Sequence, residues 1–301
     1  MDVAGAAGIA LGAAADLVFA DPRRGHPVAG FGRAAAALEQ RTYRDSRTAG
    51  ALHWAACVVP VAALGVVLPH RVLVTAVATW AVLGGTSLGR AGTRMDDLLD
   101  DLPAARAHLP TLAGRDPSSL GGAELVRATV ESVAENTSDA AVAPLVWGAV
   151  AGVPGLLAYR AVNTLDAMVG YRSERYARFG WASARADDVA NWVPARLTAA
   201  LTVAVAPLVG GSASGALAAW RRDGGAHPSP NSGRCEAAAA GALGVRLGGR
   251  NVYGTRVEDR PTMGDGEPPV RADIGRAVAL SRAVWTAAAA LAVTARLLRR
   301  R

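Results

Sequence analysis

The fold is decided by residues 51–89, which read ALHWAACVVPVAALGVVLPHRVLVTAVATWAVLGGTSLG. Two apolar runs, 51–69 and 71–89, flank a short turn at Pro69-His70-Arg71. An apolar run of about 20 residues is long enough to cross the hydrocarbon core of a bilayer as a helix. The two runs therefore predict a hairpin of membrane-spanning helices.

Similar apolar runs lie near both ends of the chain, at 2–20 and 277–298. Two weaker candidates, 138–158 and 195–213, are interrupted by Pro and Gly. Broken helices are tolerated at membrane depth where they line a protein cavity, so we expect both to be re-entrant or half-buried. The polar segments between the spans would then all lie on the cytoplasmic face of the cell membrane. These segments are 21–50, 90–137, 159–194 and 214–276.

The composition agrees with a membrane protein. Of the 301 residues, 51% are hydrophobic and 19% are charged, whereas soluble domains are about a quarter charged. All 32 basic residues are Arg, which excludes a P-loop lysine and Schiff-base chemistry. The Arg residues form no aromatic-basic patch, so we expect no nucleic-acid partner. The sequence predicts an all-α, polytopic membrane helical protein, one domain over 1–301, with large polar loops on one face.

The polar segments contain both predicted helices and predicted loops. Segments 90–112 and 123–136 have helical periodicity, whereas 221–234 and 250–271 are dense in Gly and Pro and predict ordered loops. The acidic cluster Asp96–Asp101 is similar to the Asp-rich diphosphate motif of prenyl transferases. A solvated helix face explains it as well, and we interpret it as one.

The densest polar motif is Glu131-Ser132-Val133-Ala134-Glu135-Asn136-Thr137-Ser138-Asp139. Glu131 and Glu135 are four residues apart and share one helical face. Two neighbouring carboxylates repel unless a cation lies between them, so the spacing predicts a divalent-metal or amine site. The alternative is a solvated helix end.

A second motif runs from Arg160 to Tyr171 and places Asn163 and Asp166 on one face of an apolar helix. A carboxylate buried there needs a partner such as Arg160 or a metal ion. Arg175, a little further on, offers a bidentate fork for phosphate or carboxylate. An ordinary basic face beside a membrane is the alternative for that arginine.

A third motif is Asp187-Asp188-Val189-Ala190-Asn191-Trp192, with Arg196 shortly after it. Its two carboxylates and one amide supply hard oxygen ligands suited to Mg²⁺ that carries nucleotide phosphates. A helix cap is the alternative reading of the same residues.

The loop that begins at His227 reads HPSPNSGRCE, and its two prolines restrict the backbone. Ser229 and Asn231 present hydrogen-bonding groups in this loop. If the Ala-rich stretch 237–243 is helical, the N-terminus of that helix would favour an anion such as phosphate.

Together these motifs resemble one family, the CobD/CbiB adenosylcobinamide-phosphate synthases of cobalamin biosynthesis, over nearly the whole chain. The stretches that carry the resemblance are Asp21-Pro22, His26-Pro27, Glu131–Asp139, Arg160–Tyr171, Asp187–Trp192, His227–Arg234, Asn251–Gly254, Arg260-Pro261 and Met263-Gly264.

The resemblance implies a multispan membrane enzyme that joins a carboxylate of cobyric acid, a corrinoid, to the amine of aminopropanol phosphate or aminopropanol. ATP and Mg²⁺ are expected to activate the carboxylate. We expect the following catalytic residues: Glu131, Glu135, Asp166 and His227. The expected metal ligands are Asp166, Asp187 and Asp188. The residues expected to bind nucleotide, phosphate or substrate are Arg160, Asn163, Arg175, Asn191, Arg196, Ser229 and Asn231.

Two other functions fit parts of the sequence. A membrane prenyl or phosphoalcohol transferase would use the two Asp-rich clusters to hold magnesium. A transporter would use Asp16 and the broken segments 138–158 and 195–213 as a substrate path. The transporter leaves the His227 loop and the large polar segments without a role.

Overall fold

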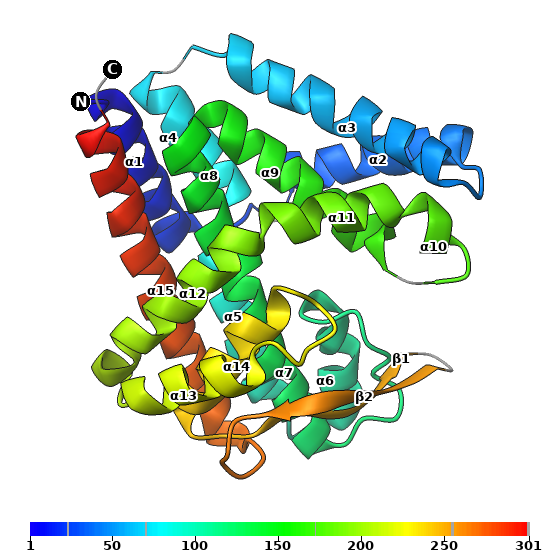
Figure 1. Ribbon diagram of the computed structural model, residues 1–301, viewed down its shortest axis with the longest axis vertical. Helices are drawn as coiled ribbons and strands as arrows, with labels where there is room; N and C mark the ends of the chain where they lie inside the picture. The colour runs from blue at the N-terminus through cyan, green and yellow to red at the C-terminus, as the bar shows by residue number, and fades with distance from the viewer. Residues whose placement is uncertain (23, 70, 172, 254–255, 300–301) are drawn as a thin grey trace. The chain divides into compact units, whose positions relative to one another are not determined.

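The computed structural model describes residues 1–22, 24–69, 71–171, 173–253 and 256–299, with backbone alone at 250–253 and 256–258. Figure 1 shows the helices and strands in chain order. The α-helices are α1 (Val3–Phe19), α2 (Pro27–Thr42), α3 (Arg47–Val67), α4 (Val72–Val82), α5 (Gly85–Leu98), α6 (Leu102–His108), α7 (Gly122–Thr137), α8 (Ala143–Ala151), α9 (Val153–Leu165), α10 (Tyr176–Phe179), α11 (Trp181–Ala190), α12 (Trp192–Val205), α13 (Ala213–Asp223), α14 (Ser232–Leu243) and α15 (Arg271–Leu298). Short turns are η1 (Leu109–Thr111), η2 (Ser138–Val142), η3 (Asp166–Gly170) and η4 (Ala206–Val209); the strands are β1 (Leu247–Tyr253) and β2 (Arg256–Met263).

The all-α class is confirmed, with one exception at 250–271. This predicted loop contains most of an antiparallel hairpin of β1 and β2, in which Arg250 pairs with Asp259 and Tyr253 with Arg256. The Gly and Pro residues of 250–271 predicted a loop, but the segment pairs with β1, whose register shifts between Leu247 and Gly249. The side chains of Asn251–Tyr253, and all of Gly254, lie outside the described residues.

Chain contacts divide the protein into two compact units, each assembled from separate stretches. The first unit comprises Met1–Gly84, Asp139–Trp192 and Ala288–Arg301, and the second comprises Gly85–Ser138 and Val193–Ala287.

Small residues bring helices of the first unit close together. A Cβ on Gly8 of α1 would lie 2.4 Å from Thr75 Cβ of α4, and a Cβ on Gly12 would lie equally close to Thr79 Cβ. Helices in lipid associate through such close packing, because apolar side chains gain nothing by leaving an apolar solvent.

Four helical stretches in the described parts of the chain are long and apolar enough to cross a membrane. They are Arg47–Val67, Val72–Leu98, Trp192–Val209 and Arg271–Leu298. The predicted spans 51–69, 71–89 and 277–298 coincide with three of them, while the N-terminal candidate forms the shorter helix α1. The chain is therefore a polytopic helical membrane protein.

The two weak segments differ from each other. Segment 138–158 is broken at Gly152, whose φ of 69° ends α8 and starts α9. The two short helices fold back against each other, so that a Cβ on Gly155 would lie 2.2 Å from the carbonyl oxygen of Trp147. By contrast, Trp192–Val209 is continuously helical and qualifies as a span, so the expected break lies only after it, at Gly210.

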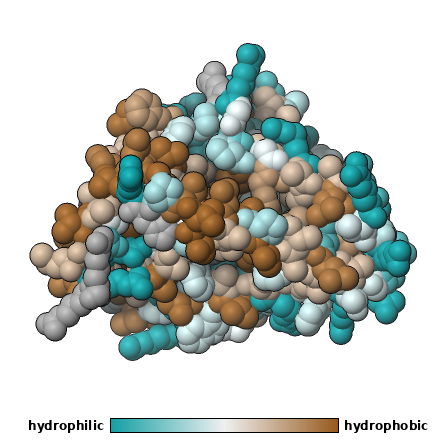
Figure 2. Space-filling view, turned by 90° about the horizontal axis from the view of Figure 1, so that it is seen from above, coloured by the Kyte–Doolittle hydropathy of each residue, from teal (hydrophilic) through white to brown (hydrophobic). Residues whose placement is uncertain are grey.

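Apolar side chains are exposed on the membrane helices of the first unit. Figure 2 shows hydrophobic residues gathered over a broad part of the face it views. The exposed large apolar residues of α1, α3 and α4 are Val3, Leu11, Leu17, Val18, Phe19, Leu52, Val59, Leu64, Val66, Val67, Leu73 and Val77. Contiguous exposed apolar surface of this kind is typical of contact with lipid.

Candidate active site

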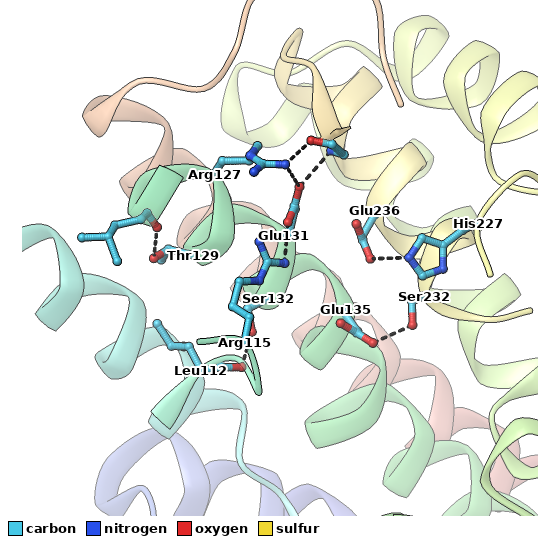
Figure 3. A network of polar contacts seen from close by, with 12 residues as sticks. Leu112, Arg115, Arg127, Thr129, Glu131, Ser132, Glu135, His227, Ser232 and Glu236 are labelled. Atoms are coloured by element: carbon cyan, nitrogen blue, oxygen red, sulfur yellow. Dashed lines mark hydrogen bonds and ion pairs between the residues drawn. The ribbon is translucent and has the colours of Figure 1, made fainter. Parts of the chain in front are cut away.

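The second unit contains a buried acidic cluster centred on α7. Glu131 is 2% exposed, and its Oε2 lies 2.6 Å from Arg115 Nη2. Its Oε1 accepts a hydrogen bond of 2.8 Å from the Gly248 amide and lies 3.7 Å from Arg127 Nη1. Figure 3 shows this carboxylate between the two arginines. The cation that the sequence required beside Glu131 is thus supplied by arginine.

Gly248 allows β1 to reach Glu131. Its φ is 87°, and a Cβ at this position would lie 2.2 Å from the carbonyl oxygen of Pro261. Only glycine adopts this backbone without strain, and the amide then points at the carboxylate. Glu131 therefore ties β1 to α7.

Glu135 lies one turn further along α7 and has a different environment. It is half-buried, and its Oε1 accepts a 2.5 Å hydrogen bond from the Ser232 hydroxyl. Ser232 Oγ also lies 3.2 Å from Ser229 Oγ, and Ser229 is partly exposed on the loop. A chain of two hydroxyl groups therefore connects Glu135 with the surface loop, and Figure 3 shows its first link, from Ser232 to Glu135.

The N-terminus of α14 has the features of an anion-binding site. The amides of Asn231 and Ser232 point to Ser229 Oγ, at 3.3 and 3.2 Å. Arg196 Nη1 lies 3.5 Å from Asn231 Oδ1, and Arg234 is close enough to repel the charge of Arg196. Two arginines beside the N-terminus of a twelve-residue helix favour phosphate or carboxylate. The structure thus brings Arg196, Ser229 and Asn231, predicted from separate motifs, close to one another.

His227 occupies the same loop, but its geometry differs from that of a ready base. The Ser229 amide donates a 3.0 Å hydrogen bond to Nδ1, so the neutral ring carries its proton on Nε2. That nitrogen faces Glu236 Oε1 at 3.7 Å, and the imidazole side chain is only 3% exposed. The Nδ1 lone pair of His227 thus accepts a hydrogen bond within the loop, so it is not available to take a proton from a substrate.

Glu236 was missed by the sequence reasoning. It is 1% exposed, and neither carboxyl oxygen has a hydrogen-bond partner in the part of the chain that the structure describes. Burial, together with the charges of Glu131 and Glu135, raises the pKa of Glu236 well above its ordinary value. The signal in the sequence was a single acidic residue directly before the Ala-rich run of α14.

A second polar cluster lies in the first unit, around α9 and α11. Arg160 Nη1 donates to Asn163 Oδ1 at 3.2 Å, and Asn163 Nδ2 donates to Asp187 Oδ1 at 3.3 Å. Asn191 Nδ2 donates to Asp187 Oδ2 at 2.9 Å, and Tyr159 OH donates to Asn191 Oδ1 at 2.8 Å. Four residues predicted from two separate motifs thus belong to one network, which Tyr159 completes.

Three other predicted residues make the following contacts. Asp188 pairs with Arg185 at 3.2 Å on the outer side of α11. Asp166 lies against Gly170 of η3, where a Cβ would be 1.8 Å from Oδ1. Arg175 bonds Glu39 at 3.0 Å and stacks over the Tyr43 ring, and the hydrogen bond to Glu39 raises the pKa of the guanidinium.

The acidic cluster Asp96–Asp101 is a solvated helix end, as we interpreted it. Arg271 Nε lies 2.7 Å from Asp96 Oδ1, and its Nη1 lies 2.9 Å from both carboxylate oxygens of Asp100. These side chains are exposed. An arginine occupies the place where a diphosphate-bound magnesium would be needed, which disfavours the prenyl transferase.

Metal binding by protein side chains alone has no support in the described residues. Within them, no group of three His, Cys, Asp or Glu side chains is arranged to hold an ion. The two oxygens of Asp187 accept hydrogen bonds from the amide groups of Asn163 and Asn191. Mg²⁺ commonly uses one or two carboxylates together with substrate phosphates, and Asp187 would be the carboxylate of this network for such an ion.

Comparison with known proteins gives one consistent answer. A family model described as "CobD/Cbib protein" matches residues 9–281. A protein named "Cobalamin biosynthesis protein CobD" from Mycobacterium tuberculosis is 60% identical over 296 residues, which cover 96% of this chain and 95% of that protein. Proteins of the same name from Geobacter metallireducens and Stutzerimonas stutzeri are 48% and 41% identical, and the matches cover 87% and 90% of both chains. No solved structure matches the chain.

Proposed function

The chain belongs to the CobD/CbiB family, and on that premise we propose that it is a membrane enzyme of cobalamin biosynthesis that joins a cobyric acid carboxylate to the amine of aminopropanol phosphate. The reaction consumes ATP and forms an amide. We place the enzyme in the cell membrane, with its polar segments on the cytoplasmic side, where ATP is available.

Amide formation needs two activations. A carboxylate oxygen is a poor leaving group, so it first attacks the γ-phosphorus of ATP, and ADP leaves. The amine nitrogen then attacks the acyl carbon, and inorganic phosphate leaves with the carbon–oxygen bond. The ammonium form of the amine cannot attack, so a base must remove its proton.

Glu135 is the group we assign as that base, and its position carries the proposal. It is more accessible than Glu131 and Glu236, which are both buried. It also lies one hydroxyl away from the anion-binding N-terminus of α14. An amine that carries a phosphate needs a base and an anion site close together. The arrangement therefore favours the phosphorylated amine over free aminopropanol.

Arg196 and Arg234 are assigned to the phosphate of this substrate, together with the hydroxyl groups of Ser229 and Ser232. The guanidinium groups repel each other in the protein alone, and a bound phosphate dianion would relieve that repulsion. Arg234 Nε has no hydrogen-bond partner in the described part of the chain.

Magnesium that carries the nucleotide phosphates is assigned to Asp187, with Asn163 and Asn191 beside it. When bound, the ion offsets the negative charge between nucleotide and carboxylate. Arg160 is held next to this group by Asn163 and by the carbonyl oxygens of Val82 and Ala140. We assign Arg160 to contact a phosphate while its guanidinium group stays where these partners hold it.

The test is a purified-protein assay that follows ADP release and corrinoid mass together. We expect Glu135→Gln to lower the turnover number by about 10²–10⁴-fold, the usual contribution of a general base. Gln keeps an oxygen that can accept the Ser232 hydroxyl hydrogen bond, so the fold should survive. Glu124→Gln is the matched control, because Glu124 only caps the start of α7.

Full activity in Glu135→Gln would exclude Glu135 as the base. Absence of product from folded wild-type protein, with either aminopropanol phosphate or aminopropanol, would exclude the synthase itself.

A further inference from the structure

The carboxyl group of Glu236 is buried, and its oxygens accept no hydrogen bond from the described residues. The charged and titratable groups that influence it come from each neighbouring element: Glu131 and Glu135 from α7, Arg115 from the preceding loop, Arg260 from β2, and His227 from the loop before α14. Its contact with His227 Nε2, at 3.7 Å, is longer than a hydrogen bond. A buried polar group without a partner costs free energy and calls for an explanation.

His227 connects this carboxyl group to the loop. Nδ1 accepts the Ser229 amide, so the Nε2 proton is directed at Glu236. The ring also lies on the first turn of α14, since a Cβ on Gly233 would be only 2.3 Å from His227 Cβ. The imidazole is therefore fixed on three sides: by Ser229, by Gly233 and by Glu236.

The loop in turn positions the reacting groups. Ser229 Oγ receives the amides of Asn231 and Ser232, and Ser232 Oγ donates to Glu135. If His227 releases the Ser229 amide, the turn that orders these groups is lost. The position of Ser232 on Glu135 thus depends on the tautomer of His227.

We infer that Glu236 is a positioning residue: through His227 it holds the loop His227–Asn231 folded on α14, and it thereby keeps Ser232 on Glu135. The inference rests on the proposed function only in treating Glu135 as the base. The loop geometry itself does not depend on the reaction.

The loop that Glu236 holds through His227 responds to pH. Because burial and two neighbouring carboxylates raise its pKa, Glu236 keeps its proton above the ordinary value of 4.5. In that range the folded protein binds more protons than the unfolded chain, so this group's contribution to stability falls as pH rises through the raised pKa. Once ionised, Glu236 carries a charge that burial and the carboxylates of Glu131 and Glu135 disfavour, so its carboxylate moves toward water and the loop that rests on it loosens.

The test measures hydrogen exchange at the amides of Ser229, Asn231 and Ser232 from acidic to alkaline pH, as protection factors corrected for intrinsic exchange. The wild-type protein should lose protection at these amides by about tenfold as pH rises, the effect of one lost hydrogen bond. Glu236→Gln, which mimics the protonated carboxyl group, should keep it throughout. Glu236→Leu, which removes the carboxyl group that His227 Nε2 faces, should lack this protection at every pH.

Glu267→Gln is the control, since it makes the same change on an exposed residue of the same unit and should behave as wild type. In synthase assays, Glu236→Gln should also extend activity to higher pH. Equal pH dependence of protection in wild type and Glu236→Gln would overturn the inference. Because exchange needs no substrate, this outcome is distinct from a failure of the proposed reaction.

Discussion

The Asp187 cluster of the first unit and the Glu131–Glu236 cluster of the second contain the same kinds of side chain but satisfy them differently. Asp187 receives an amide donor on each carboxylate oxygen, and those amides are bonded in turn to Arg160 and Tyr159. In the second cluster Glu131 is ion-paired, Glu135 has one hydroxyl partner, and Glu236 has no hydrogen bond among the described residues. Carboxylates in unequal environments can divide acid, base and structural roles among themselves. We therefore expect the first cluster to bind and orient, and the second to move protons.

The two cysteines provide one reporter for each cluster. Cys57 lies in the first unit and Cys235 in the second, and both thiols are reduced and buried. In Cys57→Ala protein a thiol-reactive dye reports unfolding around Cys235, and in Cys235→Ala protein it reports unfolding around Cys57.

The largest expected effect is on stability of the second cluster. Arg115→Leu leaves the Glu131 carboxylate buried without its closest charged partner. Removing one partner of a buried pair costs about 3–5 kcal/mol. Labelling of Cys235 during heating in detergent should begin at a much lower temperature.

Adding Glu131→Gln to Arg115→Leu should restore part of the loss, because the buried charge is then removed as well. Gln also keeps an oxygen for the Gly248 amide. If Arg115→Leu unfolded at the wild-type temperature, the ion pair would not stabilise this cluster, and the contrast between Glu131 and Glu236 would disappear.

The membrane helices were predictable because a bilayer imposes a length on apolar runs, and 51–69, 71–89 and 277–298 all met it. The β-hairpin was not predictable. Gly and Pro in 250–271 are typical of a loop, and the sequence does not reveal the partner strand or the contact of β1 with the Glu131 carboxylate. Spacing also placed Glu131 and Glu135 on one face correctly. It could not show that Arg115 pairs with Glu131, since Arg115 comes from another segment.

The candidate site was predictable to a similar extent. Loop chemistry singled out Ser229 and Asn231, but it did not show that Arg196 lies beside Asn231. Helical spacing paired Asn163 with Asp166, whereas in the structure Asn163 bonds Arg160 and Asp187. The adjacent acids Asp187 and Asp188 predicted a shared site less well. They point to different partners because neighbouring residues on a helix are about 100° apart. Glu236 could not be found from spacing, since its significance comes from burial.

A smaller effect is expected at Asp187, where the change from carboxylate to amide tests the first cluster. In Asp187→Asn one of the two donors, Asn163 or Asn191, would face an N–H₂ group instead of an oxygen. One unsatisfied buried group costs about 1–3 kcal/mol, so Cys57 should be labelled at a moderately lower temperature.

Asp188→Asn is the matched control for Asp187→Asn, because the neighbouring carboxylate pairs with the largely exposed Arg185. If Asp187 also holds nucleotide-bound magnesium, Asp187→Asn should raise the magnesium concentration needed for half-maximal synthase activity, while Asp188→Asn should not. The same magnesium requirement in all three proteins would leave Asp187 with a structural role alone.

The smallest effect is expected at Arg271, although this side chain makes more hydrogen bonds than any carboxylate of either cluster makes in the recorded contacts. It donates to both oxygens of Asp100, to Asp96 Oδ1 and to the Asp96 carbonyl oxygen. All three side chains are exposed, so water and salt screen the charges in the folded state and replace them after mutation. Arg271→Gln should therefore leave the labelling temperature of Cys235 and the synthase activity at their wild-type values, in low and high salt alike. A shift as large as that of Asp187→Asn would mean that the number of contacts, rather than their burial, decides which polar clusters stabilise this protein. Burial would then not explain why the Asp187 cluster and the Glu131–Glu236 cluster differ.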